Sequence, residues 1–393
     1  MAGLKVLIQR HGEVDVEGVV DFISSLDSPR LVLLFSSIED EFVNLDFFQA
    51  AMGKIKLPFL GVRVIDCASK EGYSEDLLLV VVLCGDCKAR VLSTEIDCSN
   101  PDITANQINS AIGAEELMIT YSANVAKNNA WVNYILKTVQ KKNPALQIFG
   151  GVCGNPPFIA TADGVFNNRL GYVLIDGLKF DFEVDSGFKF LNDGSKHVVT
   201  KSDEYYIREL DGVTAPEKYC RIQHVQPYFL NMFSNLFVKP KCGKLMRALS
   251  KTSTTMYEGV MKMGVKLLGS EICANVVEIL SCMELGKDYI LSQNNRRVGT
   301  VLQRVTTSPE DQLNTYDRLK NKAKNPKAII VSSCFMCACC FDFKFDRLKE
   351  KLGQFNCPIV VIYGWGEIGA PLPPKKSDGN LLHGGVIKSL IIK

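Results

Sequence analysis

A single carboxylate stands among glycines near the C-terminal end of the sequence. Residues 358–363 form an apolar run that leads into Gly364-Trp-Gly-Glu-Ile-Gly369, so Glu367 follows the end of a predicted strand. Glycines let a ligand or another strand approach the backbone closely. A carboxylate held there needs hydrogen-bond donors, because an unpaired buried charge is costly. Two interpretations follow: Glu367 accepts backbone N–H groups within a turn, or it contacts a bound guest.

Closely spaced cysteines are the second group that could carry chemistry. Cys334-Phe-Met-Cys-Ala-Cys-Cys340 contains one Cys-x-x-Cys pair, and Cys84-Gly-Asp-Cys87 supplies another. Two such pairs have the form of a zinc ribbon, but ribbons place their pairs within a few tens of residues, whereas these pairs lie in opposite halves of the chain. We therefore predict no metal site, and we keep a zinc protein only as an alternative.

Thiol chemistry needs more than a cysteine. A reactive thiol requires a lowered pKa beside positive charge, and a nucleophilic thiol requires a base positioned on it. No sequence feature ties any of the four histidines to Cys334, and most free cysteines behave as small buried apolar side chains. We predict no catalytic residues and a protein that is not an enzyme, with a cysteine enzyme as an alternative.

Nucleotide-binding signatures are also missing. Gly150, Gly151 and Gly154 lack the Gly-Lys-Ser/Thr end of a Walker loop, and they do not form a Gly-x-Gly-x-x-Gly turn that opens a helix. A tight turn ahead of two prolines explains them. We expect no cofactor.

Composition indicates a soluble protein with a substantial core. The chain has 393 residues, 47% of them hydrophobic, and a formal net charge of +2, which gives no electrostatic reason to expect nucleic acid or an anionic membrane as partner. Its apolar runs are far shorter than the roughly 20 residues of a membrane-spanning helix. The first residues read as a strand rather than a signal peptide, so we expect reduced cysteines and a cytoplasmic location, with the nucleus as an alternative.

The elements that must position these groups alternate between strand and helix, which is typical of an α/β fold. Cys84-Gly-Asp-Cys87 predicts a tight hairpin, and residues 158–197 read as several hairpin-like strands. The predicted helices are 14–26, 42–52, 128–141, 256–280, 309–323 and 346–352, and the predicted strands are 31–35, 59–65, 77–83, 89–92, 115–121, 147–149, 328–332 and 358–363.

A change of composition divides the chain near residue 213. We predict two related lobes, 1–212 and 213–393, each a mostly mixed β-sheet packed with helices. From residue 239 to residue 266 the chain is rich in lysine and arginine. This basic segment is interpreted as a solvated helical face, with docking of an acidic partner as the alternative.

Several motifs occur in the order found in FIST domains. Phe149-Gly-Gly-Val-Cys-Gly154 resembles the Gly-Gly turn of the N-terminal half of that family. Residues 163–177 resemble the hairpin after it, and Glu209-Leu-Asp-Gly212 resembles the joining segment. In the C-terminal half, Ile330-Val-Ser-Ser-Cys334, Gly366-Glu-Ile-Gly369 and the His383 block resemble the closing strands. The chain is thereby identified as similar to tandem FIST N and FIST C halves across nearly its whole length.

The resemblance implies binding rather than catalysis. FIST domains act in bacterial sensory proteins as ligand-binding modules, and in F-box only protein 22 they recognise substrates for ubiquitination. The chain shows no recognisable F-box, and it has Phe335-Met-Cys337 where the family has Gly-Arg. We expect a module that recognises a protein partner and is linked to ubiquitin-dependent degradation through another subunit. The alternative is a sensor of an amino-acid-like metabolite, with a pocket between the lobes. The candidate ligand-binding residues are Glu367, Gly366, Cys334, His383 and Gly151.

Overall fold

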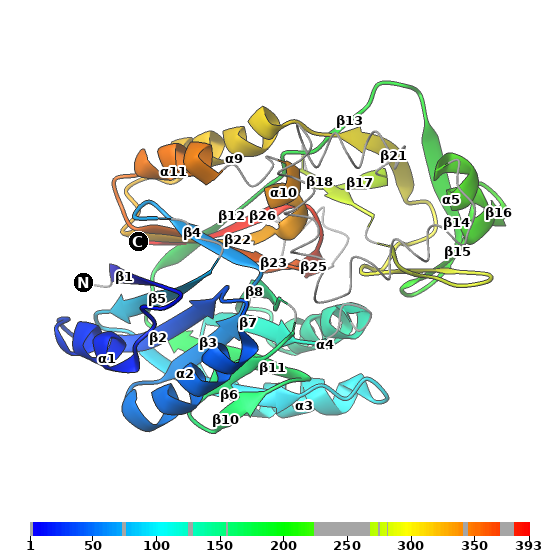
Figure 1. The fold of residues 1–393 in the computed structure, drawn as a ribbon. Helices are drawn as coiled ribbons and strands as arrows, with labels where there is room; N and C mark the ends of the chain where they lie inside the picture. The colour runs from blue at the N-terminus through cyan, green and yellow to red at the C-terminus, as the bar shows by residue number, and fades with distance from the viewer. Residues whose placement is uncertain are drawn as a thin grey trace.

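In the described part of the chain, four β-sheets and the helices packed on them form the α/β fold that the alternating pattern predicted (Figure 1). The computed structural model describes residues 3–72, 76–124, 129–154, 156–223, 268–273, 276–280, 282–340, 345–369 and 381–393. The predicted basic segment 239–266 lies outside these ranges, as does the first part of the predicted helix 256–280.

The first sheet is built almost entirely from the N-terminal part of the chain. Its order is β1-β5-β2-β3-β9-β10. Helices α1 (Val16–Ser24) and α2 (Glu41–Lys54) pack on one face, and α2 links the parallel strands β2 and β3. Every residue of β5 is buried, as expected for a strand covered on both faces. The strands are β1 (Gly3–Arg10), β2 (Pro29–Ser36), β3 (Phe59–Arg63), β5 (Leu77–Cys84), β9 (Ile159–Thr161) and β10 (Gly164–Phe166).

The prediction of a hairpin at Cys84-Gly-Asp-Cys87 is wrong. Strand β5 already pairs with β1 on one edge and with β2 on the other, so the strand that follows it in sequence cannot pair with it. The chain turns at Gly85, whose φ of 117° suits glycine, and β6 (Lys88–Glu95) joins the second sheet. The hairpin-like segment near residue 163 is divided in the same way: β9 pairs with β10, while the following strand pairs with β6 and β7.

The second sheet combines strands from distant parts of the sequence in the order β25-β24-β8-β7-β11-β6. Helices α3 (Pro101–Ala111) and α4 (Asn129–Lys142) lie along it (Figure 1). Helix α4 connects the parallel strands β7 and β8. The pattern did not predict α3, because its buried face includes only a short set of small or apolar residues. The strands are β7 (Leu117–Ala123), β8 (Gln147–Val152), β11 (Arg169–Asp176), β24 (Glu367–Gly369) and β25 (Leu382–His383).

The third sheet has the order β12-β26-β22-β23-β4. Its parallel strands β22 and β23 are joined through α10 (Phe335–Cys340) and α11 (Phe345–Gly353), and α9 (Pro309–Lys322) packs beside α11. Because β4 and β12 come from the N-terminal part, strands from both sides of residue 212 share this sheet; the division into 1–212 and 213–393 stays a prediction. The strands are β4 (Asp66–Ser69), β12 (Phe180–Asp185), β22 (Ala328–Cys334), β23 (Ile359–Gly364) and β26 (Ile387–Ile392).

The fourth sheet has the path β18-β17-β21-β14-β15-β20-β19, and α5 (Ala215–Gln223) packs on β15. Residues 268–273 and 276–279, part of the predicted helix 256–280, form two antiparallel strands instead. Val276, Val277 and Ile279 are β-branched, which favours strand once a pairing partner is present. The strands are β13 (Lys189–Phe190), β14 (Lys196–Asp203), β15 (Tyr206–Leu210), β16 (Val213–Thr214), β17 (Leu268–Cys273), β18 (Val276–Ile279), β19 (Cys282–Leu285), β20 (Ile290–Ser292) and β21 (Val301–Thr306).

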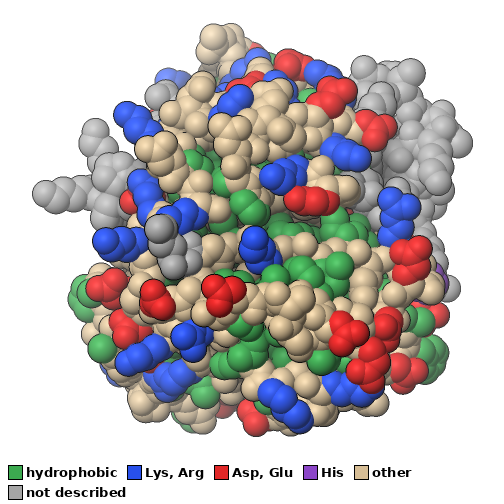
Figure 2. All heavy atoms as spheres, turned by 90° about the vertical axis from the view of Figure 1, so that its left-hand side faces the viewer, with side chains coloured by type: hydrophobic (Ala, Val, Ile, Leu, Met, Phe, Trp, Pro, Cys, Tyr) green, Lys and Arg blue, Asp and Glu red, His purple; other side chains and the backbone are tan. Residues whose placement is uncertain are grey.

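A single large core joins the first three sheets. One cluster of buried side chains contains residues of β2, β5, β7, β22 and β23 together. Partly buried side chains of β1 and β12 pack against its rim, and Figure 2 shows a band of hydrophobic side chains across the middle of one face, between charged side chains above and below it. None of the helices in the described ranges has the length and hydrophobicity that crossing a bilayer requires.

Candidate functional site

The structure brings the five predicted ligand-binding residues into one region. Strand β24 lies between β8 and β25, so Glu367 is directly opposite Gly151 on one side and His383 on the other. Gly366 immediately precedes β24. Cys334, at the end of β22, is close enough for the charge of Glu367 to raise the pKa of its thiol. We call this region the junction, because here the second and third sheets meet.

The Glu367 carboxyl is completely buried. The backbone N–H of Val386 donates to Oε2 at 3.3 Å, while no nitrogen or oxygen donor of the described residues reaches Oε1. Burial raises the pKa of Glu367 well above its ordinary value; Lys388 and a hydrogen bond from the Cys334 side chain act in the opposite direction. The group is therefore biased toward its protonated form, in which it can both donate and accept.

Lys388 on β26 holds the strand ends of the junction together. Its ammonium, 2% exposed, donates to the carbonyl oxygens of Glu367 at 3.2 Å and Leu381 at 3.0 Å, and also to that of Gly369. A fourth contact joins Nζ to Nδ1 of His383 at 2.7 Å. Because a lysine ammonium only donates, Nδ1 accepts, and the His383 ring carries its proton on Nε2. Sequence reasoning missed Lys388, although a lone lysine in an apolar closing strand was a visible signal.

A buried ion pair of the fourth sheet borders the junction. Glu278 on β18 is fully buried, and its Oε2 lies 2.9 Å from Nη2 of Arg296, itself 2% exposed. The Oε1 atom of Glu278 accepts from Asn294 and from the backbone N–H of Gly384 at 3.3 Å. The charge of Glu278 contributes to the raised pKa of Glu367. The fourth sheet is therefore electrostatically coupled to Glu367 through the loop that follows β25.

Buried amide groups without partners lie at the carboxyl end of β7. Asn124 is 3% exposed and Asn129, the first residue of α4, is completely buried. Neither the Nδ2 nor the Oδ1 atom of either side chain has a hydrogen-bond partner in the described part of the chain. Ser122 Oγ and Trp365 Nε1 likewise have no hydrogen-bond partner among the described residues. Native interiors pair nearly all such groups, so this set calls for hydrogen-bonding groups beyond those that the described residues supply.

Backbone contacts connect these amides to the junction. Ser122 is opposite Val152 in the parallel pair β7–β8, and Val152 exchanges hydrogen bonds with Trp365 and Gly366. One turn after Asn129, Asn133 accepts from the backbone N–H groups of Leu381 and Leu382. Residues four apart lie on one face of a helix, so Asn129 is on the side of α4 that faces β25. Sequence reasoning did not identify Asn124 or Asn129, because an Asn before a helix is also an ordinary cap.

The glycines of the junction are explained by close packing. A Cβ atom on Gly151 would lie 3.1 Å from Ser332 Oγ and 3.2 Å from the carbonyl oxygen of Gly366. A Cβ atom on Gly366 would lie 2.7 Å from Gln293 Nε2. Gly151 therefore lets Ser332 and the backbone of Gly366 approach closely, and Gly366 does the same for the Gln293 side chain. That either glycine contacts a ligand stays a prediction.

The cysteines whose side chains are described form no shared cluster of ligands. Cys337 and Cys340 are buried in the core around β22 and β23, whereas Cys84 and Cys87 belong to two other clusters. Among the described residues, no group of three or more His, Cys, Asp or Glu side chains is placed to hold a metal ion. Burial raises the pKa of Cys334 well above its ordinary value, so its thiol is not activated as a nucleophile. The side chain of Cys339 lies outside the described part of the chain.

The fold and the junction define an α/β protein with a closed polar region at the ends of parallel strands. Residues 30–213 match the family model described as the FIST N domain. The match runs from β2 to β16 and includes Gly151, Asn124 and Asn129. The resemblance to FIST proteins is thus confirmed for this range; the FIST C-like part and the similarity to F-box only protein 22 stay predictions. No curated protein matches the chain.

Proposed function

We propose that this protein is a binding module that encloses a small polar ligand at the junction. The main support for this proposal is the pair of buried amides, Asn124 and Asn129, whose donors and acceptors have no partners among the described residues. Leaving a buried polar group without a partner costs about 1–3 kcal/mol. A ligand that hydrogen-bonds to both amides offsets this cost, and the FIST N domain match is in keeping with a binding role.

The position of the junction supports a ligand over a catalytic role. In open α/β sheets, ligands bind beside the carboxyl ends of parallel strands. Asn124 follows β7, Cys334 ends β22, and Glu367 lies on β24, in the same sheet as β7. Burial raises the pKa of the Cys334 thiol, so this arrangement supplies hydrogen bonds without supplying an activated nucleophile.

The surrounding groups favour a ligand with both donors and acceptors. Trp365 Nε1 can only donate, so it calls for a ligand oxygen or nitrogen with a lone pair. Oε1 of Glu367 can accept from an N–H or O–H group. Amino-acid-like metabolites carry both kinds of group within a few bonds. A ligand amine beside Glu367 would also favour the charged carboxylate and so lower the pKa of this group.

Native mass spectrometry of the purified protein tests the proposal. We expect extra mass under gentle conditions that disappears on denaturation, and we expect Asn129→Leu to lose it. Asn192→Leu is the matched control, because Asn192 is exposed. A bare chain in the gentle spectrum, together with an Asn129→Leu variant that is more stable than the native protein, would show that the amide has no ligand to bind.

Recognition of a protein partner is the second candidate. Phe42, in the first turn of α2, is 80% exposed, and a large exposed aromatic side chain is a common anchor in protein interfaces. This reading predicts that Phe42→Ala weakens a partner complex while Asn129→Leu leaves it intact. A link to ubiquitin-dependent degradation is supported by the sequence resemblance alone; its test is whether a ubiquitin-ligase core co-purifies with the native chain and not with Phe42→Ala.

A further inference from the structure

A cavity of about 320 Å³ lies between strands β17 and β21, away from Glu367. Within the described residues, the two strands pair at Leu268–Arg304 and Gly269–Gln303. Beyond these pairs β17 continues alongside β18 instead, so Ser270 and Glu271 separate from β21. The cavity occupies the resulting gap.

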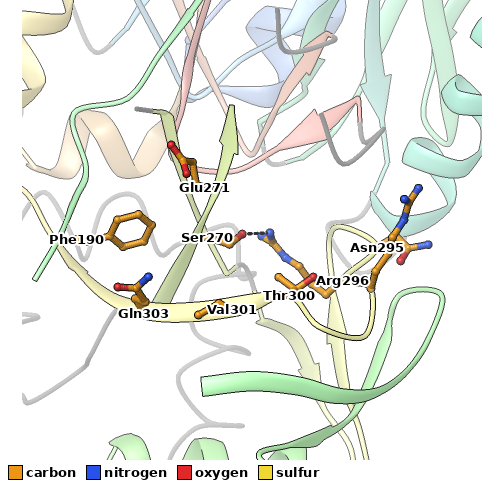
Figure 3. Close-up of a pocket in the computed structure, with 9 residues that line it drawn as sticks. Phe190, Ser270, Glu271, Asn295, Arg296, Thr300, Val301 and Gln303 are labelled. Atoms are coloured by element: carbon orange, nitrogen blue, oxygen red, sulfur yellow. Dashed lines mark hydrogen bonds between the residues drawn. The ribbon is translucent and has the colours of Figure 1, made fainter. Parts of the chain in front are cut away.

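Side chains of several elements surround this gap (Figure 3). Phe190 of β13 lies on one side, Glu271 on another, and Val301 and Gln303 of β21 lie below. Arg296 reaches in from the loop before β21 and meets Ser270. The walls therefore combine an aromatic ring and an aliphatic side chain with hydrogen-bonding groups.

Arg296 and Ser270 present donors at this cavity. Nη1 of Arg296 donates to Ser270 Oγ at 2.5 Å, and Nη2 lies 2.9 Å from Oε2 of Glu278. The buried Nε of Arg296 has no acceptor in the described ranges. Because the Ser270 oxygen already accepts from a guanidinium, its hydroxyl proton is left to donate, and the neighbouring charge polarises it. Both groups call for an acceptor oxygen.

Charge limits what that acceptor can be. The charge of Arg296 is balanced by Glu278, and the exposed residues Glu271 and Arg297 bring one charge of each sign to the lining. One carboxylate oxygen can approach the donors without a large excess of negative charge. A multiply charged anion such as a phosphate dianion meets stronger repulsion from Glu271. The apolar contacts with Phe190 and Val301 favour an organic body attached to the carboxylate.

We propose that this cavity is a second ligand site, which binds a small organic monocarboxylate. The carboxylate accepts from Ser270 and Arg296, and its apolar part lies against Phe190 and Val301. The site is separate from the junction, and it does not depend on the function proposed there.

Benzoate is a suitable probe, because it joins one carboxylate to a flat apolar ring. We expect saturable binding to the full-length protein in ligand-observed and protein-observed NMR titrations. Benzamide is the neutral control of the same shape. Its affinity should be lower by a factor of at least about ten, since it lacks the charge-assisted acceptor. Equal binding of benzoate and benzamide, or no binding of benzoate, overturns the proposal.

Two substitutions locate the binding. Val301→Trp places a large ring in the cavity at a side chain that is 39% exposed, so the ion pair beneath stays intact. Val298→Trp is the matched control, because Val298 is 62% exposed and does not line the cavity. We expect Val301→Trp to abolish benzoate binding and Val298→Trp to preserve it. Benzoate binding that survives Val301→Trp contradicts the proposal, and loss of benzoate binding in Asn129→Leu would place the probe at the junction instead.

Discussion

Removing one member of the buried Arg296–Glu278 pair should strongly destabilise the protein. In Arg296→Met, the Glu278 carboxylate stays completely buried but loses the guanidinium 2.9 Å away. Two partners that it keeps, Asn294 and the backbone N–H of Gly384, carry no charge. Removing one partner of a buried ion pair typically costs about 3–5 kcal/mol. The loss should reach the junction, because Gly384 follows His383 directly.

A double-mutant cycle separates the charge from the shape of the side chain. Glu278→Gln keeps an amide oxygen for Asn294 and Gly384 while removing the charge that Arg296 balanced. In the double variant Arg296→Met/Glu278→Gln, no buried charge is left alone, so most of the lost stability should return. We expect a coupling energy of about 2–3 kcal/mol between the two positions.

Urea unfolding followed by tryptophan fluorescence measures this cycle. Trp365 packs against Phe335 with ring centroids 5.4 Å apart, so its emission reports on the junction, while far-ultraviolet circular dichroism reports on the whole fold. Two results would refute the reasoning: an Arg296→Met variant within about 1 kcal/mol of the native protein, or a double variant whose loss equals the sum of the single losses. The first would mean that solvent reaches Glu278, and the second that the pair does not interact.

Three further predictions concern the junction and the strands around it. For Glu367, the raised pKa means that the folded state keeps a proton that the unfolded state releases near pH 4.5. Native stability should therefore fall, relative to Glu367→Gln, as pH rises from about 4.5, with a slope of up to about 1.4 kcal/mol per pH unit; urea midpoints that run parallel from pH 5 to pH 7 would contradict this. Lys388→Met removes the buried ammonium that donates to three carbonyl oxygens and to an imidazole nitrogen, although the Leu381 oxygen keeps the backbone N–H of Gly369; the change should cost about 3 kcal/mol in the same unfolding assay, whereas the exposed Lys320→Met should be nearly neutral. Gly150→Ala should abolish soluble expression, because its Cβ would lie 1.7 Å from a backbone carbonyl oxygen at a φ of +149°, while Gly53→Ala meets nothing within 4 Å and should express normally.

Local patterns predicted the elements whose hydrophobic period is long and clear. The helix predicted at 128–141 is α4, and the helix predicted at 309–323 is α9. Both carry a regular apolar face that does not depend on which strand lies opposite. The helix predicted over 256–280 was wrong in its described part, because a short apolar run fits either period, and the choice between them is made by pairing with another strand.

The junction was only partly visible in the sequence. Glu367 stood out because a carboxylate among glycines conflicts with a buried strand end, and the structure does place it opposite Gly151 and His383. Whether these residues contact a ligand stays a prediction. Asn129 and Arg296 gave no signal, because their residue types are common on helices and loops, and only burial without matching partners distinguishes them.

The sequence by itself determined the α/β class and the position of most helices, because hydrophobic periodicity acts over a few residues. Tertiary structure decided which strand ends meet. Strand β5 left the expected hairpin because its two edges were already filled, and Glu367 meets Gly151 because β24 pairs with a strand from the opposite half of the chain. Such pairings depend on backbone hydrogen bonds that any residue can make, so side-chain patterns do not specify them, and the groups that surround Glu367 are known only once the sheets have come together.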